Sequence, residues 1–294
     1  MIDFVNYVIN GALIGLLYAL IAMGFVVIYR ASKVFNFAQG ELVVFGGFLV
    51  WWLGVSVGLP LWIGVPLAFA AAALFGLAIE RIFFARLVGE SVFAMVMVTI
   101  GLLILIRGVV LLVFGPQVRP FPIVFPLQPI IVGDILVPRS LLYGGLITIA
   151  VGFGLAWFFN RTRPGLKMTA VAEDHQVAMS LGISVRGSIA FAWVLGAMLS
   201  TLGAVIYLSG KSLNFLASDI GLAALPVALL AGLESVAGLL LAGVIVGVIQ
   251  GLAVAYLDPV VGGAVGSVLP FLIMLGILFI RPTGMFGWKT IERV

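Results

Sequence analysis

Residues 7–29 read YVINGALIGLLYALIAMGFVVIY, an apolar run with no charged residue between Asp3 and Arg30. A helix needs about 20 predominantly apolar residues to cross the hydrocarbon core of a bilayer, so this run is long enough to span it. Asp3 precedes the run and no Lys or Arg does, which is a poor match to the positively charged start of a cleaved signal peptide. We therefore expect residues 7–29 to form the first membrane span.

Comparable apolar runs recur along the whole chain. Of its 294 residues, 64% are hydrophobic and only 9% are charged, whereas an ordinary soluble domain carries about 25% charged residues. We therefore expect one membrane domain over residues 1–294 and no separate soluble domain. Apolar runs bounded by charge or proline predict eight spans, at residues 7–29, 38–57, 61–79, 92–114, 141–159, 188–208, 237–257 and 265–280.

A ninth segment, residues 220–233, is short and contains Pro226. Interrupted segments at membrane depth tend to line a cavity, because their freed backbone groups need polar partners. Whether this segment crosses the membrane completely stays open at this point. The sequence predicts an all-α fold, a polytopic transmembrane helix bundle of about eight to nine spans.

Basic residues are distributed unevenly between the two sides of these spans. Eleven lie on one side, namely Arg30, Lys33, Arg81, Arg86, Arg161, Arg163, Lys167, Arg186, Arg281, Lys289 and Arg293. Three lie on the other side, namely Arg119, Arg139 and Lys211. Because Lys and Arg concentrate in cytoplasmic loops, the side with eleven is predicted to be cytoplasmic, and the C-terminus lies there. If residues 220–233 cross the membrane, the N-terminus lies outside.

A proline-rich segment at residues 115–138 is predicted to be the main external loop. Its prolines are too dense for a helix; they are Pro116, Pro120, Pro122, Pro126, Pro129 and Pro138. Residues 130–137 indicate a small hairpin around a turn at Gly133 and Asp134. Two interpretations stay open, a rigid cap that receives an external partner and a plain connector.

Glycines recur at helical spacing inside the spans. Gly243, Gly247 and Gly251 form two successive GxxxG steps, and Gly11 and Gly15 form another. Small residues at this spacing let helix backbones approach closely in a membrane. We interpret the pattern as helix packing, and it carries no information about a transported solute.

The segment at residues 160–187 is the longest polar stretch assigned to the cytoplasm. Within it, Asp174 is a good N-cap and Gly182 a good C-terminal stop, which together predict a helix of about two turns. The helix has an apolar edge at Val177, Ala178 and Leu181. Because a helix this short is unstable alone in water, it must dock on the ends of the spans or in a groove of a soluble partner.

Polar residues cluster where the second span begins. Asn36, Gln39 and Glu41 are candidates for a transport pathway. Glu41 lies at the membrane boundary, where an ionisable group is often functional. Negative charge also suits the first turn of a helix, which explains Glu41 without any transport role. Arg107 lies inside the span at residues 92–114, where snorkelling of its side chain toward the headgroups is an adequate explanation.

Enzymatic chemistry has few candidate groups in this chain. Cysteine is absent and His175 is the single histidine, which excludes thiolate chemistry and the usual zinc sites. Gly210, Lys211 and Ser212 resemble the end of a phosphate-binding loop, but Val205 stands where that loop needs glycine. We expect no enzymatic activity, no bound cofactor and no metal. Uphill transport would need energy from a partner or, in a self-contained secondary transporter, from an ion gradient.

Three motifs give the chain a family resemblance along almost its whole length. They lie at residues 10–41 (Asn-Gly, Tyr-Ala-Leu and Asn-Phe-Ala-Gln-Gly-Glu), at residues 172–183 (Ala-Glu-Asp, Ala and Leu-Gly-Ile) and at residues 281–287 (Arg-Pro-Thr-Gly-Met-Phe-Gly). In this order and spacing the chain resembles the branched-chain amino-acid ABC importer permeases, in their LivH-like branch. Gln39 departs from the family, which often has His there.

The resemblance implies a permease subunit in a bacterial cytoplasmic membrane. Its implied partners are a second permease, paralogous or identical, two ATPases that use ATP in the cytoplasm, and an extracytoplasmic solute-binding protein; no nucleic acid is expected. The implied solutes are leucine, isoleucine and valine, although relatives also handle urea, amides and aromatic acids. The residues implied to couple the chain to an ATPase are Glu173, Asp174, Val177, Ala178, Leu181 and Gly182.

Overall fold

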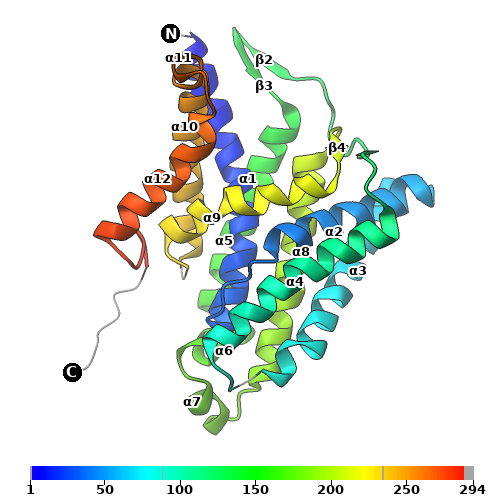
Figure 1. The fold of residues 1–294 in the computed structure, drawn as a ribbon, viewed down its shortest axis with the longest axis vertical. Helices are drawn as coiled ribbons and strands as arrows, with labels where there is room; N and C mark the ends of the chain where they lie inside the picture. Colours follow the sequence, from blue (N-terminus) through cyan, green and yellow to red (C-terminus); the bar gives the residue numbers. More distant parts are fainter. Residues whose placement is uncertain (1, 88, 234, 288–294) are drawn as a thin grey trace.

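The computed structural model describes residues 2–87, 89–233 and 235–287, and these residues form a helical bundle (Figure 1). The long helices are α1 (Ile2–Ser32), α3 (Leu61–Ile82), α4 (Val92–Phe114), α5 (Arg139–Arg161), α8 (Val185–Leu208) and α10 (Val236–Tyr256). Shorter α-helices are α2 (Gln39–Trp51), α6 (Arg163–Glu173), α7 (His175–Ser180), α9 (Asp219–Ala231), α11 (Asp258–Val261) and α12 (Val265–Ile280). A π-helical turn η1 (Trp52–Ser56) extends α2, and 3-10 turns η2 (Phe84–Arg86) and η3 (Phe215–Ser218) follow α3 and precede α9.

Seven helical segments of the described chain are long and apolar enough to cross a membrane, which confirms the predicted polytopic bundle. They are α1, α2 with η1, α3 with η2, α4, α5, α8 and α10. The eighth expected span corresponds to α12, whose 16 residues extend only about 24 Å along the helix axis. The segment at residues 220–233 corresponds to α9, with Pro226 inside the helix. Complete crossing by α12 stays a prediction, and whether α9 crosses completely stays open.

The two ends of the bundle carry different structures (Figure 1). One end, called here the hairpin end, holds the antiparallel strands β2 (Ile130–Val132) and β3 (Ile135–Val137), which confirms the predicted hairpin. The opposite end holds α6 and α7 and is called here the α7 end. Helices α1, α5, α8 and α10 run roughly along the long axis between these ends, whereas α2, α4 and α9 are inclined to it.

The proline-rich loop is tied to its neighbours by backbone and side-chain hydrogen bonds. Its strand β1 (Arg119–Pro120) pairs with β4 (Ser212–Leu213), which follows α8. The backbone N–H of Leu136 donates to Asn6 Oδ1 at 3.0 Å, which connects the hairpin to the start of α1. The start of α1 therefore lies at the hairpin end.

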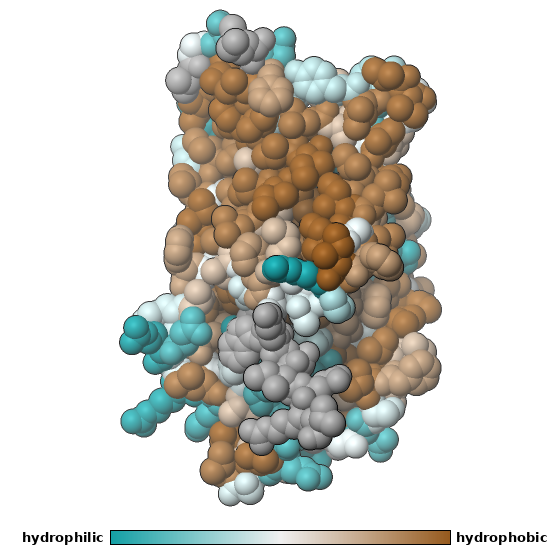
Figure 2. Space-filling view, turned by 90° about the vertical axis from the view of Figure 1, so that its left-hand side faces the viewer, coloured by the Kyte–Doolittle hydropathy of each residue, from teal (hydrophilic) through white to brown (hydrophobic). Residues whose placement is uncertain are grey.

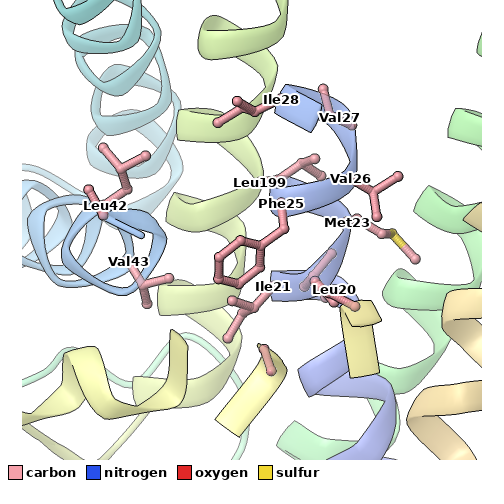
Figure 3. Packing of buried hydrophobic residues seen from close by; sticks show 14 of the residues in the cluster. Leu20, Ile21, Met23, Phe25, Val26, Val27, Ile28, Leu42, Val43 and Leu199 are labelled. Atoms are coloured by element: carbon pink, nitrogen blue, oxygen red, sulfur yellow. The ribbon is translucent and has the colours of Figure 1, made fainter. Parts of the chain in front are cut away.

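Helix α1 is the central element of the bundle and packs against α5, α8, α9 and α10. Figure 3 shows Ile21 and Phe25 of α1 directed toward the side where Leu42 and Val43 of α2 lie, and all four are buried. On another face of α1, glycines meet glycines of α10. A Cβ atom on Gly15 would overlap the carbonyl oxygen of α10 residue Gly243, so only glycine allows this approach.

The outer surface of the bundle is largely apolar (Figure 2). Hydrophobic residues cover the upper and middle part of the face shown, and hydrophilic residues gather toward its lower end. Large exposed apolar side chains of the membrane-length helices include Trp62, Phe93, Leu112, Phe153 and Trp157. A band of this kind is what lipid tails require. Lys289 and Arg293, two of the basic residues used to predict orientation, lie outside the described residues.

Candidate functional site

Two charged side chains meet inside the bundle, one from α2 and one from α4. Glu41 is only 2% exposed, and its Oε1 accepts hydrogen bonds from Arg107 Nε at 2.9 Å and from Arg107 Nη2 at 2.6 Å. Nη2 also donates to Ser218 Oγ at 3.0 Å. The snorkelling expected for Arg107 is thus replaced by an inward ion pair, which neutralises a carboxylate that would otherwise be very costly to bury.

The ion pair lies well inside the length of α4. Arg107 precedes the last residue of that helix, Phe114, by about two turns, which corresponds to about 10 Å along the axis. The start of α4 at Val92 is about 22 Å away in the other direction. The pair therefore lies roughly a third of the way in from the end where α4 meets the proline-rich loop.

A pocket surrounds this ion pair between α1, α2, α4 and α9. Together with the open space at its mouth the pocket has an empty volume of about 410 Å³, and its lining residues are Phe25, Phe35, Phe37, Gly40, Glu41, Leu103, Arg107, Ser218, Asp219, Gly221, Leu222 and Leu225. The pocket combines an aromatic and aliphatic wall with charged groups, the arrangement that small-molecule sites use for affinity and orientation.

The start of α9 is held against the start of α2 by a close backbone approach. A Cβ atom on Gly221 would lie 2.5 Å from the Cα atom of Gly40, so both positions need glycine for the helices to pack in this way. This approach places Ser218 and Asp219 beside the carboxylate of Glu41. The interrupted segment at residues 220–233, which the sequence predicts to line a cavity, lines this pocket with its N-terminal half.

Asn36 and Gln39, the other two pathway candidates, do not line the pocket. Both are completely buried in the protein core. Gln39 Nε2 donates to Ser200 Oγ at 2.8 Å, and Gln39 Oε1 accepts from Asn36 Nδ2 at 3.2 Å. Asn36 Oδ1 also accepts from the backbone N–H of Ala38 at 3.0 Å. Their contacts join the start of α2 to α8, so of the three candidates only Glu41 faces the pocket.

Two polar residues of the pocket, and the role of a third, were not predicted from the sequence. Arg107 was noticed but not paired with Glu41, because 66 positions separate them and only the fold brings them together. Ser218 and Asp219 stand directly before the interrupted segment at residues 220–233. The short length of that segment and its Pro226 indicated a cavity, and Ser218 and Asp219 lie at the edge of the segment.

The predicted short helix is α7, and its caps are the expected ones. Asp174 Oδ1 accepts from the backbone N–H groups of Gln176 at 2.7 Å and Val177 at 3.0 Å. Gly182, after the helix, has a φ of 75°, a conformation that glycine adopts without strain. The helix spans six residues, slightly fewer than the two turns expected.

The apolar residues of α7 point in different directions. Ala178 is buried against the bundle, whereas Val177 is 54% exposed and Leu181, at the C-cap, is 71% exposed. The preceding helix α6, which sequence reasoning did not separate from this loop, packs against α1, α5 and α8. Glu173 Oε1, at the end of α6, lies 4.0 Å from Nζ of Lys33, which directly follows α1. An exposed apolar edge is thus presented on a segment attached to the central helix.

Long apolar helices around a charged pocket, with a short capped helix exposed at one end, define a polytopic membrane protein. The chain belongs to the family described as "Branched-chain amino acid transport system / permease component", which matches residues 7–278. This match confirms the resemblance inferred from the three motifs. The family consists of transport permeases rather than enzymes, in agreement with the expectation from composition.

Individual relatives are similar to the chain over almost their whole length. The high-affinity branched-chain amino acid transport system permease protein BraD of Pseudomonas aeruginosa is 30% identical, covering 99% of this chain and 98% of the relative. The corresponding permease protein LivH of Escherichia coli K12 is 26% identical, with the same coverage. A probable branched-chain amino acid transport permease of Methanocaldococcus jannaschii is 24% identical and covers 98% of this chain and 95% of the relative. No solved structure matches the chain.

Proposed function

We propose that this chain is the transmembrane permease subunit of an ABC importer for branched-chain amino acids. In this proposal two cytoplasmic ATPases supply the energy, a solute-binding protein delivers leucine, isoleucine or valine, and a second permease completes the path. The relatives support this substrate class, because they are named as branched-chain amino acid permeases and are similar to this chain over nearly its full length. The membrane would be the bacterial cytoplasmic membrane, with the C-terminus on the cytoplasmic side.

The observation that carries the proposal is the geometry of α7. An isolated helix of six residues is unstable in water, yet this one is capped at both ends and leaves Val177 and Leu181 exposed at the α7 end. An exposed apolar edge on a short, fixed helix fits insertion into a groove on a soluble protein. A partner ATPase is the soluble protein that an ABC importer provides at this place.

Movement of α7 would reach the transmembrane helices through α6. Arg30 of α1 donates from Nη2 to Thr169 Oγ1 of α6 at 3.1 Å, and its guanidinium stacks 4.2 Å from the ring centroid of Phe159 in α5. These contacts join the coupling segment to the central helix and its neighbour. Closure of the ATPases would then shift α1 relative to α2 and α9 and alternate the access of the pocket.

The face that carries the pocket would form the solute path. The side chain of Arg107 is 41% exposed although it lies within a membrane-length helix, and a charged group at that depth avoids lipid tails. We propose that this face of α2, α4 and α9 turns toward the second permease and the path between the two subunits. The apolar faces of α3 and α5, which carry Trp62, Leu74, Phe153 and Trp157, would contact lipid.

Replacing Val177 or Leu181 with Glu tests the proposed coupling. Each change places a charge in the apolar contact with an ATPase, so ATP-driven leucine uptake should fall at least tenfold while the chain still inserts in the membrane. Leu166→Glu is the matched control, since Leu166 is also an exposed leucine but lies on α6. Normal uptake in both α7 variants, in vesicles containing the assembled importer, contradicts the proposal.

The self-contained transporter that the sequence left as an alternative makes a different prediction. If the purified chain alone moves leucine across liposomes without ATPases, the energy comes from elsewhere and the importer proposal fails. Co-purification from the native membrane with two ATPases and a second permease is the expected result. Mass spectrometry of the purified complex identifies these partners.

A further inference from the structure

The Glu41–Arg107 pair leaves hydrogen-bonding capacity unused inside the pocket. Both bonds from the guanidinium go to Glu41 Oε1, whereas Oε2 is buried and has no hydrogen-bond partner among the described residues. A carboxylate and a guanidinium that served only to neutralise each other would usually bond through both oxygens, in the bidentate arrangement. A buried carboxylate oxygen without a donor is costly, so Arg107 compensates the negative charge of Glu41 only in part.

Arg107 and one further charged residue, Asp219, face the same pocket with unused hydrogen-bonding capacity. In the described part of the chain, Arg107 Nη1 has no hydrogen bond to another residue, and the Arg107 side chain is 41% exposed. Asp219, the first residue of α9, is exposed and lines the pocket beside Glu41. The pocket therefore offers one acceptor carboxylate, a second negative charge beside it and one donor edge.

This set of charges is complementary to a zwitterion. An ammonium group would be received by the exposed carboxylate of Asp219, beside the negative charge of Glu41, while a carboxylate would be received by the open edge of Arg107. The remaining wall is apolar, with Phe37, Leu103 and Leu222 available to an aliphatic side chain. Each charged end of the solute then finds its partner in the same cavity.

We propose that this pocket is a binding site for the zwitterion of an aliphatic α-amino acid, with Asp219, beside the negative charge of Glu41, on the ammonium and Arg107 on the carboxylate. The inference rests on the proposed function and adds a selective site within the permease itself. Selection of the solute would then occur at two places, at the binding protein and again at this pocket. A neutral amide or urea would leave the charges of the pocket without partners and would bind weakly.

The absence of cysteine from the chain allows a direct test of occupancy. Leu222→Cys places a thiol on the pocket wall, where it should react with a water-soluble, charged methanethiosulfonate reagent. The test uses the permease assembled with its second permease and ATPases but without binding protein, and mass spectrometry follows labelling of this chain. Ile131→Cys in the hairpin is the control thiol, because Ile131 is exposed and belongs to the distant proline-rich loop.

We expect L-leucine to slow labelling of the Leu222→Cys thiol and to leave labelling of the control thiol unchanged. Leucinamide, which lacks the carboxylate, and 4-methyl-2-oxopentanoate, which lacks the ammonium group, should protect at concentrations at least about tenfold higher, since each loses a charged hydrogen bond. Adding Asp219→Asn should weaken protection by leucine about tenfold. Protection by leucinamide equal to that by leucine overturns the proposed zwitterion site.

Uptake by the parent importer separates failure of this inference from failure of the proposed function. If the importer accumulates leucine with ATP but leucine gives no protection at the Leu222→Cys thiol, the zwitterion site is wrong and the importer stands. If leucine protects the thiol but the importer accumulates no amino acid, the site stands and the proposed function is wrong. Uptake is measured with the importer that contains the cysteine-free parent chain and its binding protein, and labelling with the Leu222→Cys variant in the same lipid and buffer.

Discussion

At the scale of single residues, Glu41 and Arg107 stabilise each other because they leave water together. Helix α2 places the carboxylate in a position with almost no exposure, and α4 brings a guanidinium within 2.6 Å of it. Desolvation of each charge is unfavourable, and their mutual attraction offsets it only while both are present. The pair is therefore expected to behave as a unit in stability measurements.

The Arg107→Gln substitution tests this dependence. It leaves the buried carboxylate of Glu41 without a counter-charge, and breaking a buried pair in this way typically costs about 3–5 kcal/mol. Because Arg107 is partly exposed, we expect a loss near the lower limit, seen as a lower midpoint of thermal unfolding in detergent. The double variant Glu41→Gln with Arg107→Gln should recover much of the loss. A double variant as unstable as the sum of the singles contradicts the coupling.

The sequence allowed Glu41 to be recognised as a candidate, because a carboxylate followed by an apolar run is visible without a structure. It did not distinguish Glu41 from Gln39, although the two side chains face opposite environments. Residues two positions apart on a helix lie on different faces, and here one face meets α8 and the other meets the pocket. Which face is polar depends on the neighbouring helices, and local spacing does not contain that information.

At the scale of elements, α1 and α10 approach through glycines that leave no space for a side chain. A Cβ atom on Gly11 would lie 2.6 Å from the carbonyl oxygen of Gly247, and one on Gly247 would overlap the backbone of Gly11. In a membrane such helix contacts depend on close packing, since lipid tails are as apolar as the side chains. The spacing of these glycines predicted close packing but did not reveal which helices meet.

Gly247→Ala should therefore separate α1 from α10 and destabilise the protein. Overpacking of this kind costs about 1–3 kcal/mol, and the unfolding midpoint in detergent should fall accordingly. Gly108→Ala in α4 is the matched control, because nothing lies within 4 Å of a Cβ atom there. That control gains helix propensity and should be neutral or slightly stabilising. Equal midpoints for the two variants exclude the proposed steric role of Gly247.

The cap of α7 offers a separate test at the element scale. Asp174→Ala removes the acceptor of two backbone N–H groups, and loss of an N-cap typically costs about 1 kcal/mol of helix stability. Asp174→Asn keeps an acceptor and should retain most of the helix. We expect faster hydrogen exchange of the Gln176 and Val177 amides in the alanine variant, together with weaker coupling of ATP hydrolysis to uptake. Unchanged exchange in that variant contradicts the capping role.

The helix α6 shows a limit of prediction at this scale. Its sequence contains Pro164 and Gly165 near the start, which read as loop signals, yet the structure has Thr162 as N-cap and Pro164 in the first turn. Proline is tolerated in the first turn because the N–H groups there lack helical partners. A Cβ atom on Gly165 would overlap the backbone at Phe158, so the glycine serves the tight junction with α5. Pro164 and Gly165, which usually interrupt helices, therefore both lie in the first turn of α6.

At the scale of the whole molecule, the path of the chain constrains how many times it crosses the membrane. The loop after α8 pairs with the proline-rich loop at the hairpin end, and the end of α10 returns there, where Tyr256 lies 5.9 Å from Tyr7 between ring centroids. The chain between these points must enter the bundle and come back. The short helix α9, with its Pro226, forms the inward part of this path, and α10 forms the outward part.

This topology predicts which residues are reachable from each side of the membrane. In the cysteine-free chain, Ile131→Cys in the hairpin and Val260→Cys in α11 should both react with an impermeant maleimide added to spheroplasts, because both positions are exposed at the hairpin end. Leu181→Cys at the α7 end should react only after the membrane is permeabilised. Labelling at Val260→Cys decides the crossing by α9. If that thiol requires permeabilisation while Ile131→Cys does not, α9 and α10 do not form the inward and outward path, and the placement of the pocket between α2, α4 and α9 fails with it.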